Sequence, residues 1–168
     1  MNPPLKVGIA LGSNLGNREA NLQAGFDFLQ ELSSAGYLLK SSILSTEPID
    51  CPPGSWSFLN AVAEIQWGES PERLLSRLKD FEIELGRPLD RPINSPRPLD
   101  LDIIYFGDRT IHRPDLIIPH PRAAQREFVL KPLAEIRPNL ILPGESHTIL
   151  ELCSQLHAAI PHKPRKRN

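Results

Sequence analysis

The order of strand-like and helix-like segments constrains the fold of this chain more than any other feature of its sequence. Strand patterns occupy residues 6–12, 36–46, 57–67 and 100–106, and a helix pattern follows the first and the third of them. Side chains alternate between two faces in a strand, whereas apolar residues recur every three to four positions in an amphipathic helix. The order strand–helix–strand–strand–helix–strand predicts an α+β fold.

Both helices carry recognisable start signals, and the second also has a stop signal. Asn17 is placed to cap the first helix, Ser70 followed by Pro71 opens the second, and Gly86 ends it. The apolar stripes are Leu22, Phe26 and Leu29 in the first helix and Leu74, Leu78, Phe81 and Leu85 in the second. With these helices in place, the order is that of a ferredoxin-like βαββαβ antiparallel sheet with helices packed on it.

The second half of the chain is expected to extend this unit. Many of the 18 prolines lie between residues 88 and 143, which predicts fixed turns and short strands there. Residues 123–136 have a mixed pattern, and 147–160 form a last amphipathic helix with Ile149, Leu152, Leu156 and Ile160 on one side. We expect a single domain over 1–160, in which a C-terminal extension follows the sheet and its helices. A basic, disordered tail is expected at 161–168.

Composition narrows the functional classes. With 19 basic and 20 acidic residues, the chain offers no general attraction for nucleic acid or for a membrane surface. Its two cysteines are too few for a disulfide framework, and no apolar run reaches the length of a membrane span. We expect a cytoplasmic monomer. One alternative is a ferredoxin-like module that binds RNA, which would need exposed aromatic residues on its central strands and a basic sheet face.

Two aspartates lead directly into a buried strand. Asp100 and Asp102 are two positions apart, so on a strand they point to the same face, roughly 6.5–7 Å apart. Carboxylates at this spacing suit one or two Mg²⁺ ions that share phosphate oxygens with a substrate. The alternative is an exposed polar face at the start of a strand.

The arginines before this strand favour phosphate binding. Arg87, Arg91 and Arg97 lie within eleven residues of one another, and guanidinium groups match phosphate geometry. The chain has neither a P-loop motif nor a dinucleotide fingerprint. The segment "GIALGSNLGN" follows a strand and opens a helix, so it is either a phosphate loop or a structural turn.

A third group of residues suits an aromatic substrate. Phe58 and Asn60 share one face of a strand and offer a ring for stacking and a paired donor and acceptor. Phe128 lies beyond His120 and Arg126, which could contact phosphate. Each phenylalanine could equally be part of the core.

The segment "PRPLDLDIIYFG" resembles the signature of the 6-hydroxymethyl-7,8-dihydropterin pyrophosphokinase family. The resemblance extends to "ALGSNLGN", "FLNAV", the "E-x-x-x-GR" that closes the second helix, and "IPHPRAAQREFVLKPLAEI", and covers roughly residues 6–150. It implies ATP-dependent transfer of pyrophosphate to a pterin alcohol in folate biosynthesis, with AMP as the other product.

The resemblance also implies a role for each matched residue. Asp100 and Asp102 would coordinate two Mg²⁺ ions that bridge the ATP phosphates. The residues that would hold ATP are Arg87, Arg97, His120 and Arg126, the first two acting during transfer. The residues that would bind the pterin are Thr46, Ile49, Phe58, Asn60 and Phe128, with backbone groups contributing near Thr46 and Ile49. Glu82 would help to order the loop that begins at Arg87.

The chain departs from the family pattern just before Arg97. Asn94 and Ser95 stand where many members have Trp and Gly, and Phe58 stands where some have Tyr. The first change affects the contacts that would close the site. No matched side chain is an obvious general base. A different ATP-dependent phosphotransferase on this fold remains the other enzymatic interpretation, and it would carry a different set of residues in the pterin positions.

Overall fold

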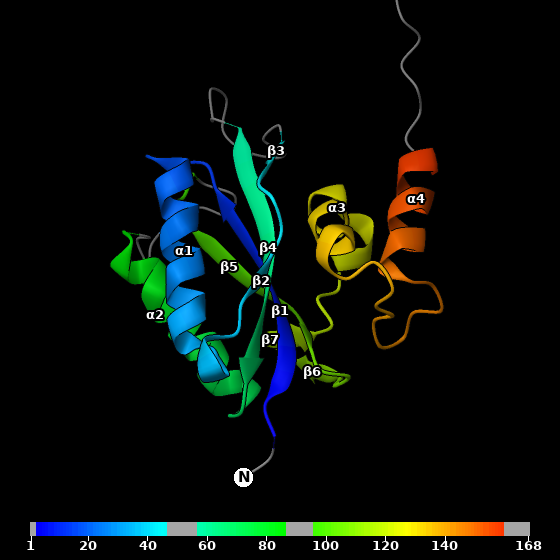
Figure 1. Cartoon of the computed structure of the whole chain (residues 1–168), viewed down its shortest axis with the longest axis horizontal. Coiled ribbons are helices and arrows are strands. Elements are labelled where there is room, and N and C mark those ends of the chain that lie inside the picture. The colour runs from blue at the N-terminus through cyan, green and yellow to red at the C-terminus, as the bar shows by residue number, and fades with distance from the viewer. Residues whose placement is uncertain (1–2, 47–56, 87–95, 160–168) are drawn as a thin grey trace, which may run out of the picture.

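The computed structural model describes residues 3–46, 57–86 and 96–159 and has an antiparallel five-stranded sheet at its centre (Figure 1). The long strands are β1 (Leu5–Ser13), β4 (Phe58–Trp67) and β5 (Asp100–Phe106), and the short ones are β2 (Leu39–Lys40) and β3 (Leu44–Thr46). The order across the sheet is β2-β4-β1-β5, with β3 also pairing with β4. The predicted α+β fold of ferredoxin-like type is confirmed.

Helices α1 (Arg18–Leu32) and α2 (Pro71–Glu84) cover one face of the sheet (Figure 1). Both predicted caps are present: Asn17 accepts a hydrogen bond from the Ala20 N–H at 3.1 Å, and Ser70 accepts one from the Arg73 N–H at 3.2 Å. Gly86 has φ +103°, which only glycine adopts easily, and follows the end of α2. The core on this face includes Val7, Ile9, Leu11, Leu22, Phe26, Leu29, Leu74, Leu78 and Leu101.

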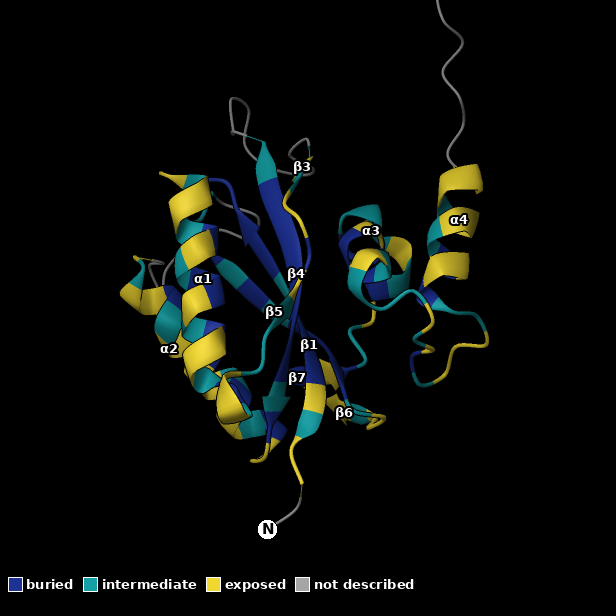
Figure 2. Cartoon of the chain, in the orientation of Figure 1, coloured by how far each residue is buried: buried dark blue, intermediate teal, exposed yellow. Residues whose placement is uncertain are grey.

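Helices α3 (Glu127–Ile136) and α4 (Ile149–Ala159) lie on the opposite side of the sheet. A second core forms there from Val62, Ile104, Tyr105, Val129, Leu130, Leu133, Ile149 and Leu152, among others. Figure 2 shows the strands buried along most of their length and the helices exposed on the sides turned away from the sheet. Strand β4 is buried on both faces and carries apolar residues at seven of its ten positions.

The strand expected over 36–46 is broken into β2 and β3. Ser41 lies at the break, where its hydroxyl accepts a hydrogen bond from the Val62 N–H at 2.9 Å. Its own N–H donates to the Val62 carbonyl, also at 2.9 Å. A serine side chain thus takes the place of a backbone acceptor, which is how such residues compete with a sheet ladder. A short 3₁₀ turn, η1 (Ser34–Gly36), precedes this region.

The proline-rich half contains more regular structure than its composition predicts. A hairpin of β6 (Ile111–Arg113) and β7 (Leu116–Ile118) agrees with the expected turns and short strands, and a 3₁₀ turn, η2 (Ala123–Gln125), follows it. Helix α3 was not anticipated, and it contains Pro132. The burial of Val129, Leu130 and Leu133 stabilises this helix despite the proline. No helix in the described ranges is long and apolar enough to cross a membrane.

Candidate functional site

Asp100 and Asp102 occupy one face of β5, next to small residues of β1. Asp100 pairs with Gly12 and Asp102 with Ala10, while the intervening Leu101 is fully buried on the other face. Both aspartates are partly buried. The pKa of the Asp102 carboxyl is raised to about 7, first by burial and then by the charge of Asp100. A carboxylate whose ionisation is opposed by burial and by a neighbouring carboxylate is stabilised in its charged form by a nearby cation.

The donor chemistry of this pair fits Mg²⁺. Both side chains offer hard oxygen ligands, and a magnesium ion normally completes its shell with water and substrate phosphate. No group of three or more His, Cys, Asp or Glu side chains in the described ranges could enclose a metal ion. A metal held by Asp100 and Asp102 would complete its shell with other oxygen ligands, such as those of water or of a substrate phosphate.

Arg97 lies beside the aspartate pair and is held there by the turn that follows β1. Its Nε is 3.4 Å from Oδ2 of Asp100. The Arg97 N–H donates to Oδ1 of Asn14 at 2.9 Å, and the Asn14 N–H donates to the Arg97 carbonyl at 3.2 Å. The segment "GSN" thus acts here as a structural turn that fixes the backbone of Arg97.

Glu82 holds the strand that carries the aspartates. This α2 residue is 1% exposed, and its Oε1 accepts a hydrogen bond from the Leu101 N–H at 2.7 Å, between Asp100 and Asp102. Its Oε2 is 3.5 Å from Nζ of Lys79. Its predicted role concerned the loop from Arg87, which lies outside the described residues, as does Ile49. In the described residues, Glu82 contacts the strand that carries Asp100 and Asp102.

His120 and Arg126 come to the same face of the sheet. The His120 N–H donates to the Ile104 carbonyl at 2.9 Å, which fixes the segment after β7 against β5. Burial, followed by the charges of Arg126 and Arg122, holds the pKa of His120 below its ordinary value, with Asp100 opposing. Its Nδ1 accepts from the Arg122 N–H at 3.2 Å. The ring is therefore neutral at pH 7, with the proton on Nε2.

Three residues on β3 and β4 form the second part of the site. Phe58 and Asn60 share a strand face, and Nδ2 of Asn60 donates to Oγ1 of Thr46 at 2.7 Å. A Cβ at Gly12 would lie 3.2 Å from Oδ1 of Asn60 and 3.7 Å from the Phe58 ring, so the glycine keeps this face open.

Two contacts connect the parts of the site. The Arg97 guanidinium lies 5.4 Å from the centre of the Phe58 ring, and the Arg126 guanidinium lies 5.4 Å from the centre of the Phe128 ring. Phe128 stands in the first turn of α3, which packs against β4. Each arginine that is expected to bind phosphate therefore lies next to a ring that is expected to bind the aromatic substrate.

Sequence reasoning did not identify three of the contributing residues. Asn14 had been treated only as part of a turn, and Gly12 carries no functional group. Lys79, which lowers the pKa of Asp102, is three residues before Glu82. That spacing places both on one side of a helix, which is a usable signal.

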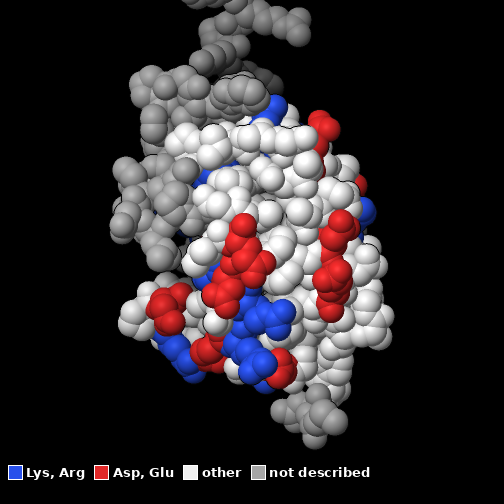
Figure 3. Space-filling model, turned by 90° about the vertical axis from the view of Figure 1, so that its left-hand side faces the viewer, with Lys and Arg blue, Asp and Glu red and all other residues white. Residues whose placement is uncertain are grey.

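The arrangement of layers argues against the RNA-binding alternative. Such a module reads bases on an open sheet face, whereas α1 and α2 cover one face here and α3 packs on the other. On the side of the molecule where α1 and α2 lie, acidic and basic side chains are interspersed (Figure 3). This face has no dominant positive charge.

The chain is similar to several known proteins. The family described as 7,8-dihydro-6-hydroxymethylpterin-pyrophosphokinase (HPPK) matches residues 8–138. Two proteins named 2-amino-4-hydroxy-6-hydroxymethyldihydropteridine pyrophosphokinase are similar over most of the chain. The one from Haemophilus influenzae is 39% identical, over 95% of this chain and 96% of that protein. The one from Pseudomonas aeruginosa is 37% identical, over 84% and 86%.

Larger proteins also contain a similar region. The folic acid synthesis protein fol1 of Pneumocystis carinii is 40% identical over 93% of this chain, which spans only 20% of its length. A crystal structure of Plasmodium falciparum HPPK-DHPS has a TM-score of 0.69 at 15% identity, over 92% of this chain and 43% of that one, and supports the fold. From the family match and the bacterial relatives, the chain belongs to the 7,8-dihydro-6-hydroxymethylpterin-pyrophosphokinase family and is a pyrophosphokinase of folate biosynthesis.

Proposed function

We propose that this chain transfers the pyrophosphoryl group of ATP to the hydroxymethyl oxygen of 6-hydroxymethyl-7,8-dihydropterin and releases AMP. The observation that carries this proposal is the contact between the two halves of the site. Arg97 lies both beside Asp100 and over the Phe58 ring, so a phosphate at the aspartates and a ring at Phe58 would be neighbours. Proximity of this kind is the main requirement for a transfer between two bound substrates.

Asp100 and Asp102 would hold Mg²⁺, and two ions are expected. There it would supply positive charge that neutralises the phosphates of ATP and lowers the barrier to attack at phosphorus. Burial and the charge of Asp100 disfavour the ionised form of Asp102 and raise its pKa. A cation bound to the pair would offset both effects, which supports this assignment. Glu82 would keep the two aspartates aligned by binding the strand between them.

Arg97, Arg126 and His120 would hold the phosphates. Each arginine brings a permanent positive charge, and neutral His120 can donate its Nε2–H. Arg87 is proposed to join them during transfer, although it lies outside the described residues. Charge stabilisation of this type supplies most of the rate enhancement in phosphoryl transfer.

The pterin would bind between β4 and α3. Because Nδ2 of Asn60 already donates to Thr46, the amide orientation is fixed and Oδ1 can accept from an N–H of the pterin edge. Phe58 and Phe128 would stack on the ring from the two sides. Ile49 is proposed to contribute through its backbone.

Transfer would then proceed by in-line attack. The hydroxymethyl oxygen forms a bond to the β-phosphorus as the bond to the oxygen of the α-phosphate breaks, and AMP leaves. The hydroxyl proton is lost in the same reaction, and no described side chain is assigned as its acceptor.

A product assay tests the proposal. ATP, hydroxymethyldihydropterin and Mg²⁺ are expected to yield AMP in equal amount to the pterin diphosphate. Asp100→Asn should abolish the reaction while leaving the fold intact, and Asp108→Asn, on the turn after β5, is the matched control. Formation of ADP, or AMP formation without the pterin, would contradict the proposed reaction.

A further inference from the structure

A buried carboxylate outside the proposed site has no part in the reaction as described above. Glu64 on β4 is 1% exposed and points to the same strand face as Asn60, four residues away. Its Oε1 and Oε2 accept hydrogen bonds from the hydroxyls of Tyr37 at 2.9 Å and Tyr105 at 2.5 Å. The Arg137 guanidinium binds both oxygens, Nε at 2.8 Å and a terminal nitrogen at 2.5 Å. We name Glu64, Arg137, Tyr37 and Tyr105 the Glu64 cluster.

Within the cluster, Glu64 and Arg137 are charged and the two tyrosine hydroxyls are neutral donors. Burial opposes the charged form, but hydrogen bonds from Arg137, Tyr105 and Tyr37 hold the pKa of Glu64 below its ordinary value. The same carboxylate raises the pKa of Arg137, chiefly through their hydrogen bonds. A bidentate pair of this kind fixes both the distance and the orientation of its partners.

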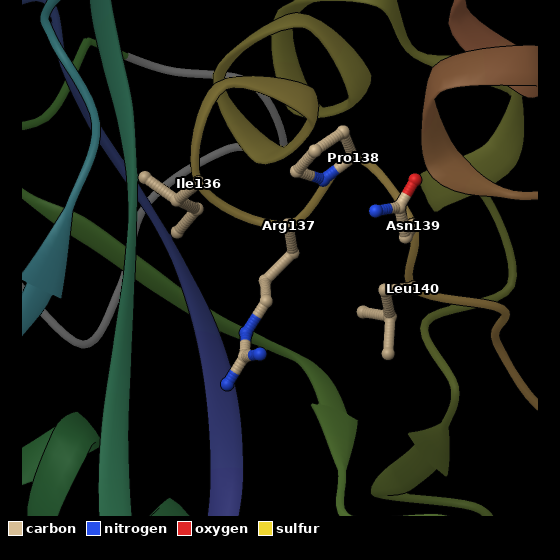
Figure 4. A pocket seen from close by; sticks show the side chains of 5 residues that line it. All are labelled: Ile136, Arg137, Pro138, Asn139 and Leu140. Atoms are coloured by element: carbon tan, nitrogen blue, oxygen red, sulfur yellow. The ribbon is translucent and has the colours of Figure 1, made fainter.

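Arg137 connects the cluster to helix α3. It is the residue directly after Ile136, where α3 ends, and Figure 4 shows its side chain extending from the end of that helix toward the strands. A second contact lies at the same end: Glu135 accepts hydrogen bonds from the Ser42 N–H at 3.0 Å and the Ser42 hydroxyl at 2.8 Å. The first contact joins the end of α3 to β4, and the second joins it to the segment between β2 and β3.

The other end of α3 carries residues of the site. Arg126 is its N-cap and Phe128 lies in its first turn, about 14 Å along the helix axis from Arg137. Val129, Leu130 and Leu133 bury one face of α3, but hydrophobic packing is non-directional and tolerates sliding. The directional contacts at the far end limit that sliding.

We propose that Glu64 and Arg137 are positioning residues for pyrophosphoryl transfer, which set the place of Phe128 by anchoring the opposite end of α3. The inference rests on the proposed function, because it assigns the effect to pterin binding. Neither residue touches substrate. Their effect on pterin binding is assigned to α3, so it requires the Phe128 ring.

The test is a mutant cycle on pterin affinity. Removing Arg137 alone would leave the buried Glu64 carboxylate without its bidentate partner, so the variant is Glu64→Gln with Arg137→Gln, which removes both charges and keeps a polar side chain at each position. We expect pterin affinity, measured by fluorescence titration of the folded protein, to fall about tenfold. Added to Phe128→Ala, the same pair of changes should weaken binding no further, because the ring that it positions is gone.

A destabilising control separates positioning from loss of stability. Phe28→Ala removes the stack with Phe81, whose rings are 4.0 Å apart on the opposite face of the sheet, and should leave pterin affinity unchanged. If the doubly substituted variant does not fold, Arg137→Lys replaces it in the cycle. This change keeps the charge but loses the bidentate contact, so the expected loss of pterin affinity is smaller.

The outcomes are distinct. Wild-type pterin affinity in the paired variant, or losses that multiply with Phe128→Ala, would overturn the positioning role while leaving the proposed function standing. Absence of pterin binding and AMP formation in the wild-type chain would overturn the proposed function and this inference with it.

Discussion

At position 8, a glycine on β1 lets a tyrosine of β5 reach across β1 to a carboxylate of β4. Gly8 on β1 pairs with Glu64 on β4 and with Tyr105 on β5. The Tyr105 ring lies across β1 at this point, in the space that a side chain at position 8 would occupy. Only a residue without a Cβ lets the tyrosine hydroxyl reach Glu64.

This crossing leads to a stability prediction. Gly8→Ala would overlap Tyr105, so the ring must move and its hydrogen bond to Glu64 must weaken. We expect the free energy of unfolding to fall by about 1–3 kcal/mol, measured by urea denaturation. Gly68→Ala is the control, since a Cβ there meets nothing nearer than Pro4 at 3.9 Å. Equal stabilities for the two variants would show that the ring adapts freely.

A second effect at the scale of a single residue is the dependence of stability on the protonation of Asp102. Its folded pKa of about 7 is raised from 3.8, so the folded state binds the proton more tightly than the unfolded state. The stabilising contribution is full below pH 3.8 and is lost as pH rises toward 7. In metal-free protein, Asp102→Asn should therefore stabilise at pH 8 by about 1 kcal/mol or more, or roughly 2–4 °C in Tm, and have little effect at pH 4.

Thermal scans at both pH values, without metal, test this expectation. Asp108→Asn, on an exposed position of the turn after β5, should change the pH dependence little. A benefit of Asp102→Asn at pH 4 as large as that at pH 8 would contradict the linkage.

At the scale of elements, a helix side chain supplies a hydrogen-bond acceptor to a strand of the sheet. Glu82 on α2 provides the acceptor for the Leu101 N–H, which separates the two aspartates of β5. Asn14, in the turn between β1 and α1, holds Arg97 in the segment before β5 in a similar way. The site therefore depends on contacts between elements rather than on β5 alone.

Replacing Glu82 tests that dependence. Glu82→Ala leaves the buried Leu101 N–H without this acceptor, which costs about 1–3 kcal/mol of stability, and it should weaken binding of Mg²⁺ with ATP. Glu82→Gln keeps an oxygen acceptor, so its losses should be smaller in both denaturation and titration calorimetry. Glu84→Ala, exposed on the same helix, is the control. Equal losses in the Gln and Ala variants would refute the role of the hydrogen bond.

At the scale of the whole molecule, the sheet separates two cores with different tasks. Helices α1 and α2 stabilise one face, and α3 closes the other face on which the aspartates, Asn60 and the phosphate-binding candidates gather. Because the proposed site is assembled from several elements and exists only in the folded state, ligand binding there should stabilise the whole chain.

That coupling predicts a thermal shift. A non-hydrolysable ATP analogue with Mg²⁺ at about 100 times its Kd should add about 2.7 kcal/mol, or roughly 5–10 °C in Tm. Asp100→Asn should lose most of this shift, and so should the wild-type chain with the analogue and a chelator. A full shift in the presence of the chelator would contradict a metal-dependent site.

The sequence by itself determined what depends on neighbours along the chain. The caps at Asn17 and Ser70, the helix stop at Gly86 and the common face of Asp100 and Asp102 follow from local geometry, and the structure contains each of them. The order of these elements was sufficient to predict the fold. The residue roles in the site, including those of Arg87 and Ile49 beyond the described ranges, stay predictions.

Only the tertiary structure decided the contacts between distant segments. Asn14 and Arg97 are 83 residues apart, Glu64 and Arg137 are 73 apart, and Glu82 and Leu101 are 19 apart. The break at Ser41 and the helix around Pro132 likewise depend on partners from elsewhere in the chain. Such contacts form because burial leaves a polar group no water to bind, and the partner that meets this need is whichever residue the fold brings near. No local pattern encodes that choice.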